Sequence, residues 1–320
     1  MIINNRWKKI ERSKNIYLPT IQNFDLINKD TKVCLMGSCF ADEMGWVLKE
    51  NQINIGEVDC NYEMKHVMYP WGTFFTPMNL FNIIDIIFED KIKKLIDEQS
   101  FIRVPKNLIG NHYESSSQFN NDKEFNLWCL FIKARLQTNE FKIATKQIYD
   151  KLNNLKNSII NANIIIITLG LIETWIDRNK KFAWHSFHGD AFKKKSIDDL
   201  AFFHQLKFEE VKNYINKITS LILGLGNKKI IFTISPIPLN FTFTNNDIVL
   251  ANKYSKSVLR SAVEEFIDNK KIFYFPSFEI VQDCVGWPNS FKEDKRHVKI
   301  EVFKEYIAPT FIKAFTNFYK

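Results

Sequence analysis

A run of β-branched residues at positions 163–169 (NIIIITL) constrains the fold of this chain more than any other segment. The run ends at Gly170, and apolar runs as short and continuous as this one are typical of parallel strands buried on both faces of a sheet. Three further runs follow the same pattern: residues 32–36 (KVCLM), 229–234 (KIIFTI) and 272–276 (IFYFP). Residues 53–58 (INIGEV) are a candidate fifth strand.

Helical patterns separate these runs. Residues 41–49 follow the first run, residues 208–221 carry an apolar stripe that ends before Gly224 and Gly226, and residues 251–266 are amphipathic. Strands that alternate with helices predict right-handed βαβ units. We therefore predict an α/β fold, a three-layer α/β/α doubly wound parallel sheet.

The spacing between the predicted strands is uneven. About 100 residues separate the candidate second strand from the run at 163–169, whereas a crossover needs only about a dozen. We predict a single domain over residues 1–320, in which residues 60–160 form a largely helical insertion. Its helical stretches lie near 78–97 and 122–160, and the insertion is expected to cap the carboxyl edge of the sheet, where ligands of such folds bind.

Composition narrows the class of protein. Hydrophobic residues make up 45% of the 320 residues, which indicates a globular chain. The net charge of +8 comes from scattered lysines, so nucleic-acid binding is not expected; the charge fits a solvated surface or an anionic partner. The five cysteines form no CxxC pair, which argues against a disulfide framework and structural zinc. Because neither a signal peptide nor a membrane span is recognisable, we expect a cytoplasmic protein.

The first candidate for chemistry is Ser38, which follows the first predicted strand and begins a helix. A hydroxyl there lies at the carboxyl edge of the sheet, and the helix N-terminus favours a developing oxyanion. The alternative is a structural N-cap, because serine is a preferred capping residue. The GxSxG motif of the α/β-hydrolase nucleophile elbow is absent, since Met36 and Phe40 occupy the positions of its glycines.

The second candidate is the pair Asp294 and His297, which follows the last predicted strand. A spacing of three lets the carboxylate reach the imidazole and fix its tautomer. In a doubly wound sheet the loops after the first and last strands lie on the same edge. The sequence therefore predicts that Ser38 and His297 come together.

Five ordered blocks resemble one known family. Residues 37–41 spell GSCFA, the motif that names the GSCFA family of the SGNH (GDSL-like) hydrolase superfamily. The other resemblances are residues 70–77 (PWGTFFTP), 168–175 (TLGLIETW), 233–238 (TISPIP) with 251–256 (ANKYSK), and the final Asp294-x-x-His297.

The resemblance implies a role for each matching residue. Ser38 would attack an ester carbonyl, His297 would take its proton, and Asp294 would orient His297. The backbone N–H groups of Ser38 and Gly72 would form the oxyanion hole. The third block of the superfamily supplies a side-chain Asn, which this chain lacks, so Gly170 is the remaining candidate there, with a backbone group or a residue of the insertion as alternatives.

Other residues have both a functional and a structural interpretation. Cys39 is an alternative nucleophile or a residue that packs inward. His112 in the insertion, and Glu173 and Trp175 after the third predicted strand, are candidate substrate contacts. His185 and His188 form a faint metal pair without a convincing third ligand, so no metal site is predicted.

The expected reaction concerns O-acyl groups, and the resemblance points to those of a carbohydrate. A hydrolase would let water attack the acyl-enzyme and needs no cofactor. An O-acetyltransferase would pass the acyl group to a sugar hydroxyl, with acetyl-CoA as a candidate donor whose phosphates suit the positive charge. The expected partner is a small-molecule or glycan substrate. The alternative is a catalytically silent glycan- or nucleotide-binding module; the sequence does not fix the oligomeric state.

Overall fold

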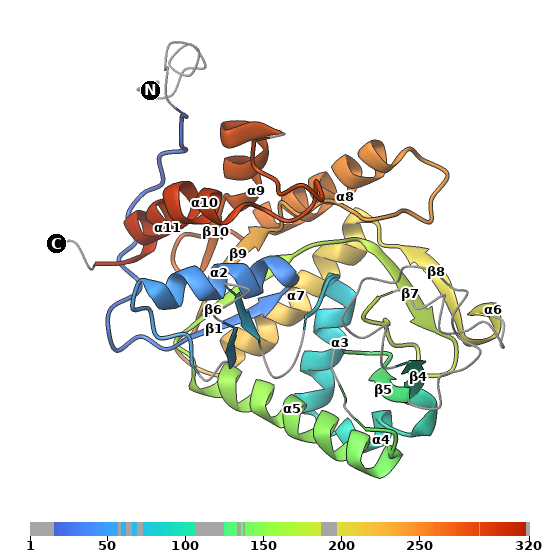
Figure 1. Cartoon of the computed structure of the whole chain (residues 1–320). Helices are drawn as coiled ribbons and strands as arrows, with labels where there is room; N and C mark the ends of the chain where they lie inside the picture. Colours follow the sequence, from blue (N-terminus) through green and yellow to red (C-terminus); the bar gives the residue numbers. More distant parts are fainter. Residues whose placement is uncertain are drawn as a thin grey trace.

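A four-stranded parallel sheet with the strand order β1-β6-β9-β10 forms the centre of the computed structural model (Figure 1). Its strands are β1 (Val33–Gly37), β6 (Ile164–Leu169), β9 (Lys229–Ile234) and β10 (Ile272–Phe275). The structure describes residues 16–56, 59–61, 66–68, 73–105, 125–132, 136, 138–186, 197–287 and 289–317.

Helices flank this sheet, an arrangement compatible with the predicted three-layer α/β/α fold. The longer ones are α2 (Cys39–Glu50), α3 (Pro77–Phe88), α5 (Phe141–Asn161), α7 (Phe208–Gly224), α8 (Ile248–Glu264) and α11 (Ala308–Phe315). The short ones are α4 (Ile92–Leu95), α6 (Ile197–Leu200), α9 (Ser277–Glu279) and α10 (Ile300–Val302), with helical turns at Glu98–Ser100, Ile280–Gly286 and Phe303–Ile307. Within the described residues, no helix is long and apolar enough to cross a membrane.

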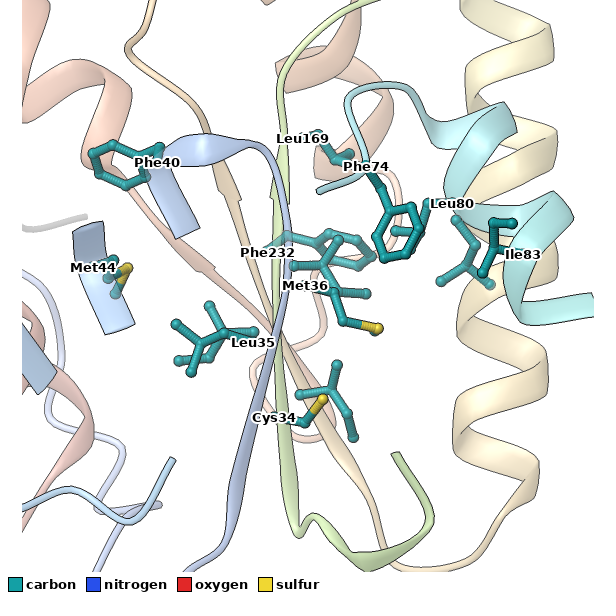
Figure 2. Packing of buried hydrophobic residues seen from close by; sticks show 14 of the residues in the cluster. Cys34, Leu35, Met36, Phe40, Met44, Phe74, Leu80, Ile83, Leu169 and Phe232 are labelled. Carbon is teal, nitrogen blue, oxygen red and sulfur yellow. The ribbon is translucent and has the colours of Figure 1, made fainter. Parts of the chain in front are cut away.

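Side chains of β1 alternate between the two faces of the sheet. Leu35 points toward Met44 of α2, whereas Met36 points toward Leu80 and Ile83 of α3 (Figure 2). The neighbouring strand β6 is buried along its whole length. Burying each such large aliphatic side chain contributes about 1.5–3 kcal/mol. Burial on both faces explains why these strands are continuous apolar runs.

The four predicted parallel strands are confirmed, and their ends differ from the predicted ones by at most one residue. The candidate fifth strand at 53–58 is wrong over its described part, because residues 53–56 form no strand. Ile53 and Ile55 are buried, and the Asn54 carbonyl accepts a hydrogen bond from the Val33 N–H (2.8 Å). This segment therefore lies beside β1 without extending the sheet; residues 57 and 58 lie outside the described residues.

The predicted insertion contains strands as well as helices. The helix expected over 122–160 is wrong at its start: Phe125–Cys129 forms β5, which pairs with β4 (Phe101–Pro105), and the helix α5 begins only at Phe141. Periodicity alone cannot distinguish a short apolar run in a strand from one in a helix. The other small antiparallel pairs are β2 (Asp59–Asn61) with β3 (His66–Met68), and β7 (Glu173–Asp177) with β8 (Ala201–Gln205). The capping role of 60–160 stays a prediction.

The helices of this segment also build the main core. α3 packs against α5 and against α7, and it lies on the face of the sheet opposite α2 (Figure 1). On the α2 face, α11 packs against α2. The core cluster runs without interruption from β1 through α3 and α5 to α11.

Gly37 ends β1 in a conformation that excludes other residues. Its φ is +133°, and a Cβ atom at this position would lie 2.1 Å from the Thr168 carbonyl oxygen on β6. Real Cβ atoms do not approach backbone oxygens so closely. Only glycine lets β1 and β6 stay paired up to the residue before Ser38.

We predict that Gly37→Ala lowers the free energy of unfolding by about 3 kcal/mol or more, because it adds both backbone strain and a backbone clash. Urea denaturation of the purified variant measures this change. Gly224→Ala is the matched control: nothing lies within 4 Å of a Cβ atom at this last residue of α7, so its stability should equal or slightly exceed that of the wild type. Equal stabilities for the two variants would contradict the prediction.

Candidate active site

Ser38 stands at the carboxyl end of β1 and at the cap position of α2. Its backbone is extended (φ −73°, ψ 174°), as expected for a cap, but its side chain makes no capping hydrogen bond. The side chain is buried, and its Oγ atom has no hydrogen-bond partner among the described residues. The capping interpretation of this serine therefore does not account for its hydroxyl group.

Three chain segments meet at Ser38. The Gly37 carbonyl accepts a hydrogen bond from the Phe74 N–H (2.7 Å), and the Phe75 carbonyl accepts one from the Gly170 N–H (3.1 Å). A Cβ atom on Gly170 would lie 3.3 Å from the Cβ atom of Ser38. The residues that follow β1, the segment that precedes α3 and the residues that follow β6 thus lie at one edge of the sheet.

The predicted oxyanion donors have specific partners here. The Ser38 N–H donates to the Thr168 carbonyl (3.2 Å), and the Gly170 N–H donates to Phe75 as described above. Either amide would have to share or leave its present bond to bind an oxyanion. Gly72 lies outside the described residues, so its role stays a prediction.

Asp294 and His297 lie together on a tight turn. A bridge between Phe291 and Val298 closes the turn. The Asp294 Oδ2 atom pairs with His297 Nδ1, while Oδ1 accepts the backbone N–H groups of Arg296 (2.9 Å) and His297 (3.0 Å). This arrangement fixes the imidazole and leaves Nε2 as the ring nitrogen that can exchange a proton.

The hydrogen bonds of Asp294 favour its charged form. Partial burial acts to raise the pKa of the carboxyl, but the bonds from His297 and from the two backbone amides outweigh it and lower the pKa to about 2. Asp294 therefore stays ionised across the physiological range and can stabilise an imidazolium on His297.

Glu43 on α2 connects the helix that begins at Ser38 with this turn. Its Oε1 atom lies 3.7 Å from Lys292 Nζ, and its Oε2 atom is buried without a hydrogen-bond partner among the described residues. Burial raises the pKa of Glu43 to about 7; Lys292 opposes this rise and Asp294 adds to it. The C-terminal segment also packs on α2, since the rings of Phe40 and Phe303 are 5.0 Å apart. The turn with His297 is thus held against the Ser38 helix.

Glu173 and Trp175 face the loop that follows β9. The Glu173 carboxylate accepts hydrogen bonds from the Thr242 hydroxyl (2.7 Å) and the Phe243 N–H (3.0 Å). Trp175 packs edge-on against Phe243, with ring centroids 5.2 Å apart. In this structure both residues hold the loop, and substrate contact stays a prediction.

The remaining candidates are Cys39, next to Ser38 in the chain, the two histidines of the suspected metal pair, and His112 in the insertion. Cys39 is half-buried and packs against the core. His185 is buried; its Nε2 atom lies 3.5 Å from the Thr73 hydroxyl, and its ring lies 5.1 Å from that of Phe75. Among the described residues no group of three or more His, Cys, Asp or Glu side chains could hold a metal ion. His112 and His188 lie outside the described part of the chain.

Two residues at this edge were missed by the sequence interpretation. Glu43 gave no signal beyond its place on the helix after Ser38. Lys256 is buried at the loops that follow β6 and β9, and its signal was present: it falls on the same face of the helix as Val258 and Leu259, which are in the core.

Comparison with models of known protein families shows to which family the chain belongs. The model of the GSCFA family matches residues 32–311, which includes the sheet, Ser38 and the turn with His297. The chain belongs to the GSCFA family. A search among curated proteins finds no match.

In this GSCFA protein, the raised pKa of Glu43 predicts a pH-dependent effect of Glu43→Gln. The wild-type carboxyl keeps its proton in the folded state up to pH about 7 but loses it near pH 4.5 when unfolded, so wild-type stability falls between these values. Glutamine cannot ionise. Denaturation should therefore show the variant about 3 kcal/mol more stable than wild type at pH 8, and little changed at pH 4.

Glu50→Gln, at the far end of α2, is the matched control. Glu50 pairs with Lys304 (3.1 Å) in a half-exposed position, so its replacement should change the free energy of unfolding by less than about 1 kcal/mol at both pH values. A Glu43 variant that is less stable than wild type at pH 8 would show that the Lys292 contact outweighs the desolvation of the carboxylate.

Proposed function

We propose that this GSCFA protein is a serine-dependent acyl-ester enzyme on an SGNH-type fold, with Ser38 as nucleophile, His297 as base and Asp294 as the residue that orients His297. The observation that carries the proposal is the Ser38 hydroxyl, which is buried at a helix N-terminus and makes no hydrogen bond to any residue that the structure describes. A buried hydroxyl without a partner costs about 1–3 kcal/mol. Such groups are retained where a substrate or a reaction uses them.

The pair of Asp294 and His297 supports the same proposal. A carboxylate that stays ionised and holds Nδ1 of a histidine is the arrangement that prepares the other ring nitrogen to act as a base. The Glu43 and Lys292 contact ties this turn to α2. The bond between Ser38 Oγ and His297 Nε2 forms, in this proposal, when substrate is bound, as catalytic hydrogen bonds often tighten in the complex.

The proposed reaction has two steps. Ser38 Oγ attacks the ester carbonyl carbon as its proton passes to His297 Nε2, and the tetrahedral intermediate then releases the alcohol, which takes that proton. Water or a second alcohol attacks the acyl-enzyme, His297 accepts the incoming proton, and the proton returns to Ser38 as the acyl group leaves. Asp294 balances the imidazolium charge in both steps.

The developing oxyanion requires donors that are not committed elsewhere. We propose the positive end of α2 and the Gly72 N–H as the main stabilisers, since the Ser38 and Gly170 amides donate to Thr168 and Phe75 in this structure. Each well-placed donor is typically worth about 3 kcal/mol of the barrier. The Asn of other SGNH enzymes is not needed in this arrangement.

We propose that the acyl group is carried by a carbohydrate hydroxyl and that the reaction takes place in the cytoplasm. An aromatic cluster beside the same edge supports a sugar ligand: Phe241 packs against Phe243 with centroids 5.2 Å apart, and Phe241 is 49% exposed. Exposed aromatic faces pack well against the apolar faces of sugar rings. Transfer would use acetyl-CoA or another activated donor, and hydrolysis would use water.

We expect the wild-type protein to release nitrophenol from p-nitrophenyl acetate, and Ser38→Ala and His297→Ala to reduce the rate by about 10³-fold or more, because each removes a member of a unit that acts together. Mass spectrometry of the acylated wild-type protein should place the acetyl group on Ser38. Assays with acetyl-CoA and with acetylated or free sugars then separate hydrolysis from transfer.

The matched control is Cys39→Ala, which removes the neighbouring nucleophile while leaving the hydroxyl in place. This variant should retain the wild-type rate within a few-fold. If Cys39→Ala lost activity and Ser38→Ala kept it, the nucleophile would be the thiol. If the wild-type protein were acylated by neither donor but bound acetylated glycans, the chain would be a binding module instead.

A further inference from the structure

Helix α8 carries polar side chains on the face that it buries. Asn252, Ser255 and Lys256 are all buried, although this face of the helix also holds Val258 and Leu259 in the core. The spacings of three and four residues place the polar side chains on one side of the helix. A helix that packs into a core ordinarily presents apolar residues there, so this polar set calls for a specific role.

Two of these side chains hold the loops at the carboxyl edge of the sheet. Asn252 Oδ1 accepts the Leu239 N–H (3.2 Å) in the loop that follows β9. Ser255 Oγ accepts the Ile172 N–H (3.2 Å) just after β6. The same helix thus fixes both loops.

Lys256 joins these two loops to each other. Its Nζ atom donates to the Gly170 carbonyl (2.7 Å) and to the Ile237 carbonyl (2.9 Å), and the residue is only 1% exposed. Lysine is rarely buried to this degree. Burial lowers the pKa of Lys256 to about 7, and the nearby Cys39 partly offsets that fall.

The backbone at Gly170 packs against the Ser38 side chain. A methyl group on Gly170 would touch the Ser38 Cβ atom at 3.3 Å and the Phe75 carbonyl oxygen at 3.3 Å. Phe75 accepts the Gly170 N–H on one side, and Lys256 binds the Gly170 carbonyl on the other. Movement of this peptide would therefore change the space around the Ser38 side chain.

We propose that Lys256 is a positioning residue for the nucleophile. By binding the Gly170 and Ile237 carbonyls together, it holds in place the Gly170 backbone, which packs against Ser38 and sets its position. The catalytic consequence rests on the function proposed above, whereas the positional effect does not. An apolar side chain of similar length would fill the same volume without the cost of burying a charge. Only a side chain with a hydrogen-bond donor can form the bonds to the two carbonyls.

Lys228 offers a matched control at the opposite edge of the sheet. It is also buried, and its Nζ atom also donates to two carbonyls, those of Ile160 (2.5 Å) and Ala162 (2.6 Å). Lys228 precedes β9, and its acceptors precede β6, so this second lysine joins the amino ends of the same strands. Replacing Lys228 therefore shows the effect of losing a buried lysine that binds two carbonyls far from Ser38.

The experiment compares Lys256→Met with Lys228→Met in the full-length chain by hydrogen exchange and by the kinetics of Ser38 acylation. In Lys256→Met the amides of Gly170 and Leu171, which both donate to Phe75, should exchange about tenfold faster or more, because the peptide is freed on one side. With p-nitrophenyl acetate, kcat should fall about 10²-fold while KM stays within about threefold. Lys228→Met should change neither quantity at this edge.

Unchanged exchange at Gly170 and Leu171 in Lys256→Met would overturn the proposal, as would an equal effect of Lys228→Met at these amides. If Lys256→Met and the donor-retaining Lys256→Gln both failed to fold while Lys228→Met folded, Lys256 would be a stability residue, and the proposal would again fall. Faster exchange in Lys256→Met together with a wild-type protein that is not acylated on Ser38 would support the positional link and refute the esterase function.

Discussion

The close contact between the Gly37 and Thr168 backbones determines where the candidate nucleophile lies. Gly37 has a φ of +133°, and the Thr168 carbonyl fills the space where a side chain would stand. The pairing of β1 with β6 continues through this contact to the Ser38 N–H, which donates to the same carbonyl. Ser38 consequently enters α2 from a fixed backbone, and every other group at this edge is arranged around that point.

The other groups reach this edge through backbone contacts and buried charges. Phe74 and Phe75 bind Gly37 and Gly170 through their main chains, which fixes the segment before α3 beside Ser38. Lys256 binds the Gly170 carbonyl and so fixes the residues that follow β6. The turn with His297 is attached through Lys292 and the buried Glu43 carboxyl, whose raised pKa reflects the burial of a charge with one distant partner. Buried charges of this kind add little stability but give the surrounding chain a definite geometry.

Much of the fold could be predicted from local pattern. The run at 163–169 and its three counterparts are buried on both faces, and this gives an unbroken apolar signal that identifies a parallel strand. The strand at Phe125–Cys129 was mistaken for a helix because its apolar run is equally short but is stabilised by pairing with Phe101–Pro105, a distant segment. Residues 53–56 form no strand, although the Asn54 carbonyl accepts the Val33 N–H, because this bond is not continued as a ladder within the described part of the segment.

The sequence by itself determined the α/β class, the GSCFA relationship, and the pairing of Asp294 with His297, because each depends on residues close together in the chain or on a recognisable motif. Only the tertiary structure decided which backbone amides near Ser38 already have acceptors, that Glu43 lies against Lys292, and that Lys256 binds two loops. Those contacts join residues far apart in sequence. Their distances and burial arise from the packing of whole elements, which no local pattern encodes.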